Sequence, residues 1–162
     1  MSFGESRNVP MEKGYERKGV SRAAALLLLS GCTTQSVVPV PHEVTACEVC
    51  VTPDASDRKV AYTATLSALR QKGFTVREVP SGATGDCKTV LTCQTVSRWD
   101  MANFTATIAY EWFENGKLLG SAKYHAANGL NFSKYINTEE KVNELLNRML
   151  PGTPALPTRY SE

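Results

Sequence analysis

One segment of the chain alternates apolar and polar residues along its whole length, which is the pattern of a β-strand with one buried face. It runs from Asn103 to Glu114, and its apolar side chains are Phe104, Ala106, Ile108, Tyr110 and Trp112. Asn115-Gly116 follows directly and is typical of a hairpin turn. A partner strand is therefore predicted from Lys117 to about Ala126.

The pairing of these two strands follows from the requirement that each face of the hairpin stays consistent. A two-residue turn would pair Ile108 with Lys123 and place a lysine on the apolar face. A type I turn with Gly116 in a bulge shifts the pairing by one residue and pairs Trp112 with Leu118. Because a slip of one residue moves every side chain to the opposite face, the bulged turn is predicted.

Helical periodicity occurs in two places. The first helix is predicted at residues 57–72, with Tyr62, Leu66 and Leu69 on its apolar face and Gly73 after its end. The second helix begins at Thr138 and ends before Pro151. Its apolar face consists of Val142, Leu145, Leu146 and Met149.

Three further strands are predicted at residues 44–51, 74–79 and 88–97, which gives the order strand, helix, four strands, helix. Two amphipathic helices on one face of a sheet form a two-layer sandwich. The predicted fold is therefore α+β, a two-layer sandwich of order β-α-β-β-β-β-α, with a mainly antiparallel sheet and both helices on one face. The predicted domain spans residues 44–150.

The segment before the domain has the features of an export signal. A block of small and apolar residues at positions 23–29 follows several basic residues and precedes Leu29-Ser30-Gly31-Cys32. This tetrapeptide resembles a bacterial lipobox, in which the cysteine receives a diacylglyceryl group and the chain is cut just before it. Residues 1–31 are therefore predicted to be a lipoprotein signal peptide, and Cys32 the lipidated residue. A short buried helix is the alternative, and either Met1 or Met11 can be the start.

Two flanking segments are predicted to lie outside the folded domain. Residues 32–43 contain two prolines and little periodicity, which suits an extended lipidated tether. Residues 151–162 also contain prolines and are predicted to be a flexible tail. By resemblance to enterobacterial lipoproteins, Thr33 in place of an aspartate after the cysteine implies the outer membrane, with the domain facing the periplasm.

Composition and charge exclude two classes of protein. The 162 residues are 42% hydrophobic and 21% charged, close to an ordinary folded domain. The formal net charge of +2 is too small for a general nucleic-acid binder. Residues 1–31 carry five of the 18 basic and three of the 16 acidic side chains, which leaves 13 of each in the mature chain. No apolar run reaches the roughly 20 residues that a transmembrane helix needs.

Four cysteines remain in the mature chain besides Cys32. If the first strand lies antiparallel to the third, Cys50 can pair with Cys87 and Cys47 with Cys93, since the two pairs have similar index sums. Both bridges cannot sit in one regular ladder, so Cys87 is predicted in the loop before its strand. Cys50–Cys87 is the first choice among three possible connectivities, and a bridge involving Cys47 and Cys93 stays possible.

The candidate chemistry is sparse. His125 has Ser121 and Lys123 on its face of the strand, but no nucleophile-elbow motif accompanies it. Cys47-Glu48-Val49-Cys50 lies in a strand pattern, which does not suit a redox pair, and no second motif completes a zinc site. We therefore expect no enzyme activity, no cofactor and no metal. Trp99 and Asp100, in a predicted turn, and His125 are the candidate partner-binding residues; alternatively, Trp99 folds back over the core.

Several of these segments together resemble one family. They are Trp99-Asp100, the stretch from Phe113 to His125, and the helix from Thr138 to Leu146. They are similar to the Sbal-type family of small Gram-negative envelope lipoproteins, over most of the chain from Cys50 to Leu150. The resemblance implies the fold and the envelope location and supports the Cys50–Cys87 bridge, but it carries no catalytic residue.

The sequence thus predicts a non-enzymatic outer-membrane lipoprotein whose periplasmic domain binds another cell-envelope component. Its partners are expected to be the membrane, through the lipid, and an envelope protein or glycan, but not nucleic acid. A small-molecule or glycan-binding module, or an inhibitor of a cell-wall hydrolase, is the alternative.

Overall fold

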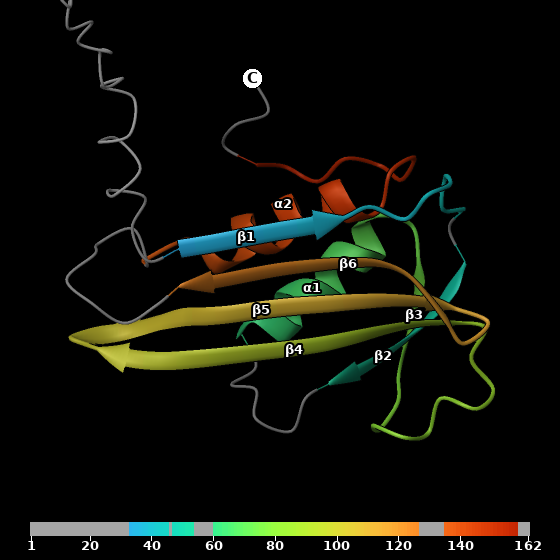
Figure 1. Ribbon diagram of the computed structural model, residues 1–162, viewed down its shortest axis with the longest axis horizontal. Coiled ribbons are helices and arrows are strands. Elements are labelled where there is room, and N and C mark those ends of the chain that lie inside the picture. Colours follow the sequence, from blue (N-terminus) through green and yellow to red (C-terminus); the bar gives the residue numbers. More distant parts are fainter. Residues whose placement is uncertain (1–32, 46, 54–59, 127–134, 159–162) are drawn as a thin grey trace, which may run out of the picture.

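A mixed β-sheet with two helices packed against one face forms the described part of the chain (Figure 1). This computed structural model describes residues 33–45, 47–53, 60–126 and 135–158. The elements in chain order are β1 (Thr33–Val38), β2 (Glu48–Pro53), α1 (Val60–Gln71), β3 (Thr75–Glu78), β4 (Thr89–Asp100), β5 (Ala102–Glu114), β6 (Lys117–Ala126) and α2 (Thr138–Met149).

The sheet has an antiparallel half and a parallel half. Its six strands lie in the order β1-β6-β5-β4-β2-β3. β1, β6, β5 and β4 pair antiparallel, whereas β2 pairs parallel with both β4 and β3. Helix α1 connects β2 to β3, as a parallel pair requires a long crossover. The predicted α+β class with both helices on one face is confirmed.

The predicted order of elements is wrong in one place, because the sheet contains a further strand before the predicted first one. β1 pairs along its whole length with β6, from Thr33 opposite Ala126 to Val38 opposite Ser121. After β1 the chain continues into the core through Val40 and Val44, both buried. The described part of the predicted tether, residues 33–43, is therefore part of the folded domain.

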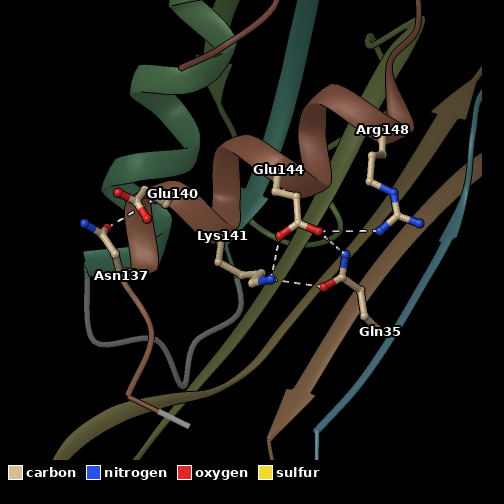
Figure 2. A network of polar contacts seen from close by, with 6 residues as sticks. All are labelled: Gln35, Asn137, Glu140, Lys141, Glu144 and Arg148. Carbon is tan, nitrogen blue, oxygen red and sulfur yellow. Dashed lines mark hydrogen bonds and ion pairs between the residues drawn. The ribbon is translucent and has the colours of Figure 1, made fainter. Parts of the chain in front are cut away.

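A polar network helps to hold β1 against α2, because Gln35 lies on the inward side of this strand together with the apolar Val37 (Figure 2). The Gln35 amide donates to Glu144 over 2.6 Å and accepts from Lys141 over 3.1 Å. Lys141 also pairs with Glu144, and Arg148 lies 3.5 Å from the same carboxylate. A buried face that uses an amide and charges lacks the apolar alternation by which strands are predicted.

The core lies between the sheet and the helices. Its large, fully buried side chains come from every layer: Leu91, Ile108, Tyr110, Trp112, Tyr124, Leu69, Leu145, Leu146 and Met149. The predicted apolar face of β5 is confirmed, since Phe104, Ala106, Ile108, Tyr110 and Trp112 are all buried. The predicted apolar face of the second helix is buried as well.

The predicted register of the β5–β6 hairpin is wrong, although the predicted faces are right. Asn115 and Gly116 both have positive φ, 49° and 76°, as a two-residue type I′ turn requires. The bulge lies one step further along the ladder, because Phe113 pairs with Leu118 and Trp112 with Gly120. The extra residue therefore lies within the ladder, whereas the prediction places it in the turn. In both arrangements one extra residue keeps the β6 side chains on the predicted faces.

The C-terminal segment also packs on the domain as far as residue 158. Leu156 is buried, and its N–H and C=O both bond to the Asn147 side chain. Asn143 donates to the carbonyl of Pro157 over 3.0 Å. The prediction of a flexible tail is therefore wrong for residues 151–158, and residues 159–162 lie outside the described part of the chain.

Candidate functional site

A groove lies on the face of the sheet that the helices leave open. Its strand residues alternate with Val51, Leu91 and Trp112, which point into the core, so they point away from the helices. The cavity has a volume of about 360 Å³, within the range of small-ligand sites. It is lined by Thr52, Ser81, Gly82, Thr84, Cys87, Val90, Thr92, Phe113 and Gly116.

The loop between β3 and β4 forms one wall of this groove and is fixed at both ends. Cys50 in β2 and Cys87 before β4 form a disulfide with Cα atoms 6.1 Å apart. At the other end, Ser81 donates to the carbonyl of Pro53 over 3.2 Å. Gly82 has a φ of +88°, a conformation that favours glycine. The loop therefore covers the open face of β2 in a defined position.

The predicted Cys50–Cys87 bridge is confirmed, and Cys87 lies in the loop before its strand, as predicted. The expected antiparallel pairing of those strands is wrong, because β2 and β4 run parallel. The possible second bridge is absent, because the exposed Cys47 and the buried Cys93 do not form a disulfide. They lie apart because Cys47 is beside Thr89 at the start of β4, whereas Cys93 faces Thr65 of α1.

His125 lies on the open face of β6, away from the groove. Its Nδ1 is 3.0 Å from the hydroxyl of Thr107, directly across the β5–β6 ladder. No carboxylate of the described residues bonds to this imidazole. A catalytic histidine is usually oriented by such a carboxylate, so the observed contact is that of a hydrogen-bonded surface histidine.

Trp99 and Asp100 lie at the end of β4, where the chain turns into β5 at Met101. Trp99 is 72% exposed and Met101 83% exposed. The alternative prediction, that Trp99 folds back over the core, is therefore wrong. Trp99 and His125 lie toward the same end of the sheet but do not share a pocket, and Cys32 lies outside the described residues.

A second, larger hollow of about 840 Å³ borders the start of α2. It is lined by Tyr135, Ile136, Asn137, Glu140, Lys141, Glu144 and Thr158. Burial acts to raise the pKa of Glu144, but hydrogen bonds from Lys141 and Gln35 outweigh it, so the pKa lies below its usual value. Tyr135 and Thr158, the first and last residues of the described range 135–158, are both among its lining residues.

Sequence reasoning missed the groove, and only a weak signal could have found it. Val90 and Phe113 are apolar residues at outward positions of their strands, and they are direct cross-strand partners. The stretch Ser81–Gly85 has the composition of a loop, but nothing in the sequence indicates that it folds over the sheet. Within the described ranges, no group of histidine, cysteine and acidic residues could hold a metal ion, and no helix is long and apolar enough to cross a membrane.

The comparisons with known proteins concern the fold alone. No protein-family model matches the chain, and no curated protein matches it either. The chain is similar in structure to the PelC dodecamer from Paraburkholderia phytofirmans, with a TM-score of 0.52 and 15% identity, over 72% of this chain and 98% of that one. A point variant of the same protein, also a dodecamer, gives a TM-score of 0.51 and 16% identity, over 73% and 97% of the two chains.

Proposed function

We propose that this protein is a non-enzymatic outer-membrane lipoprotein whose periplasmic domain binds another component of the cell envelope through the groove beside the disulfide. The observation that carries the proposal is a preformed groove on the open face of the sheet, with its wall covalently fixed. A fixed wall favours binding because less conformational freedom is lost when a ligand enters.

The lining of the groove indicates what kind of surface it accepts. Thr84 and Thr92 offer hydroxyl groups, and Val90 and Phe113 offer apolar surface. No lining residue itself carries a charge, although Thr92 also donates to Glu111 and Cys87 accepts from Arg77. Hydroxyl groups donate and accept hydrogen bonds equally well. The groove therefore suits a neutral, polar segment of an envelope partner better than a phosphate or an acidic peptide.

A glycan is the second candidate, because the same lining favours it specifically. The Phe113 ring can lie against the apolar face of a sugar, and the threonine hydroxyls can bond to its hydroxyl groups.

The lipid anchor has its own test. Replacing Cys32→Ala removes the thiol that would carry the acyl groups, each methylene of which contributes about 0.8 kcal/mol when buried in lipid. We expect the variant to leave the outer-membrane fraction in a density gradient, and Cys47→Ala, which removes a different free thiol, to stay there. Retention of Cys32→Ala in that fraction would contradict the anchor.

The groove is tested by photo-crosslinking in cells. A photoreactive residue at Thr92 lies in the groove, whereas one at Ser36 lies on the same open face but on β1, three strands away. We expect an adduct from Thr92 at several times the yield from Ser36. Peptides of a second protein in the adduct, identified by mass spectrometry, indicate a protein partner, whereas loss of the mass shift after periodate treatment indicates a glycan. Equal yields from both positions would contradict the groove.

A further inference from the structure

Exposed apolar side chains gather at one end of the domain. Among the described residues the large ones are Val38, Val60, Trp99, Met101, Leu118 and Tyr135. Trp99 and Met101 form the tip of the β4–β5 hairpin, and Tyr135 packs edge-on against Phe104 of the same hairpin with ring centres 6.1 Å apart. Val60 begins α1, which follows the end of β2, and β2 runs parallel to β4. Four of the six therefore lie toward this end.

The chain enters the domain at that same end. Thr33 pairs with Ala126, whose neighbour His125 pairs with Thr107, and Thr107 pairs with Val96. The first residue of β1 is thus level with the base of the β4–β5 tip, and both lie on the left in Figure 1. Cys32 directly precedes Thr33 in the chain, so an acyl group on Cys32 would be attached at this end of the domain.

The hairpin tip reaches further than the start of β1. From the pairing of Val96 with Thr107, β4 continues to Asp100 and β5 returns from Ala102. These four further residues of β4 extend roughly 13 Å at about 3.3 Å per residue. Figure 1 shows the tip protruding beyond β1. An acyl chain on Cys32 would therefore bring the tip into contact with the bilayer when the strands lie perpendicular to the membrane plane.

We propose that the β4–β5 tip is a second membrane contact, in which Trp99 and Met101 enter the headgroup region of the bilayer beside the acylated Cys32. This inference rests on the lipid anchor of the proposed function. Tryptophan is the side chain most typical of membrane–water interfaces, and a thioether is apolar and flexible enough to follow acyl chains. A lipid surface is favoured over a protein partner because the anchor holds it within reach of the tip.

Charge at this end does not favour a purely electrostatic contact. Arg98 precedes Trp99, but Asp100 follows it, and Glu139 and Glu140 lie in the first turn of α2, near the same end. The mature chain as a whole is neutral. Apolar insertion of the tip, and not attraction to anionic lipids, is therefore the contact proposed.

The contact would set the orientation of the whole domain. β5 has 13 residues, so it is roughly 40 Å long. Its far end carries the turn at Asn115-Gly116, and Gly116 and Phe113 line the groove. Two attachments at one end, the lipid and the tip, would hold the groove away from the bilayer and toward the periplasm.

Intrinsic fluorescence tests this directly, because the chain has only two tryptophans. Trp112 is fully buried and packs against Phe74 near the far end of the sheet, so lipid cannot reach it. The acylated full-length protein is reconstituted into vesicles of phosphatidylethanolamine and phosphatidylglycerol, with or without lipids brominated near the glycerol. We expect bromine to reduce the emission of Trp99, because a tryptophan at the membrane–water interface lies beside the glycerol region of the lipids.

Two variants serve as matched controls. Trp99→Phe leaves only Trp112, and its emission should not change with brominated lipid. Adding Leu118→Trp to this variant places a tryptophan at an exposed position beside the far turn, and it should also escape quenching. Quenching of a tryptophan at 118 to the same extent as at 99 would overturn the proposed orientation.

The outcomes separate this inference from the anchor on which it rests. Mass spectrometry of the protein from cells shows whether Cys32 carries the acyl groups. An acylated protein whose Trp99 is not quenched overturns the membrane contact and leaves the anchor standing. If the protein carries no acyl groups, the proposed anchor is wrong. The unacylated protein is then added to excess vesicles. Quenching of Trp99 supports the membrane contact, and its absence overturns the contact. A blue shift without quenching means that protein covers Trp99, which also overturns the proposal.

Discussion

Lys72 is the residue whose environment departs furthest from what its position in the chain indicates. At the end of the first helix a lysine is expected to point into water, where it favours the helix dipole. Instead its side chain is only 1% exposed. Its Nζ donates to the hydroxyl of Thr153 over 2.9 Å and to the carbonyl of Pro154 over 3.0 Å. Lys72 thus holds the C-terminal segment against α1.

Burial of this ammonium makes stability depend on pH. It lowers the pKa of Lys72 from 10.5 to about 8 in the folded protein. Between these values the unfolded chain binds more protons than the folded one, so the free energy of unfolding rises with pH in this window. Relative to Lys72→Met, the wild type should gain at most about 3 kcal/mol from below pH 8 to pH 10, as measured by urea unfolding.

The control for this prediction is Lys123→Met, at an exposed position of β6. Its pH dependence should match the wild type, because this substitution leaves the buried ammonium of Lys72 in place. If Lys72→Met follows the wild-type pH dependence as well, the ammonium is hydrated in the folded protein and the prediction is wrong.

At the scale of elements, periodicity was sufficient wherever one face of an element is apolar. The predicted strand at residues 103–114 and the helix from Thr138 are both present with the expected buried faces. β1 was missed because its inward Gln35 is satisfied by Lys141 and Glu144 of α2, more than a hundred residues away. A polar contact between distant segments does not produce a periodic pattern of apolar residues in either segment.

The direction of β2 relative to β4 was missed for a related reason. The sequence indicates that each is a strand, but the pairing depends on where the chain returns to the sheet after β3. β3 pairs with only four residues of β2, at the sheet edge. The loop from Val79 to Lys88 then crosses the open face of β2 and starts β4 on its other side. The groove forms because the loop crosses β2. The sequence alone does not show which strand the loop crosses, so it could not indicate the groove.

At the scale of the whole molecule, one covalent link holds the parallel half together. The segment between Cys50 and Cys87 contains most of β2, all of α1 and β3, and the loop over the groove. Short turns join β4 to β5 and β5 to β6, whereas α1 and a long loop join β2 to β3 and β3 to β4. Ordering these longer connections costs chain entropy on folding, and a cross-link in the unfolded state reduces that loss.

The disulfide should therefore make a large contribution to global stability. It spans 37 residues, for which the chain-entropy relation gives roughly 4 kcal/mol. The Cys50→Ala, Cys87→Ala double variant should lose most of this in urea unfolding at neutral pH, with one cooperative transition. Cys47→Ala removes an exposed thiol that forms no bridge, so it should change the free energy of unfolding by no more than about 0.5 kcal/mol. A double variant as stable as Cys47→Ala would mean that the unfolded chain is not constrained by this link. In that case the groove wall would be held by the contacts of Ser81 and the β2–β4 ladder alone.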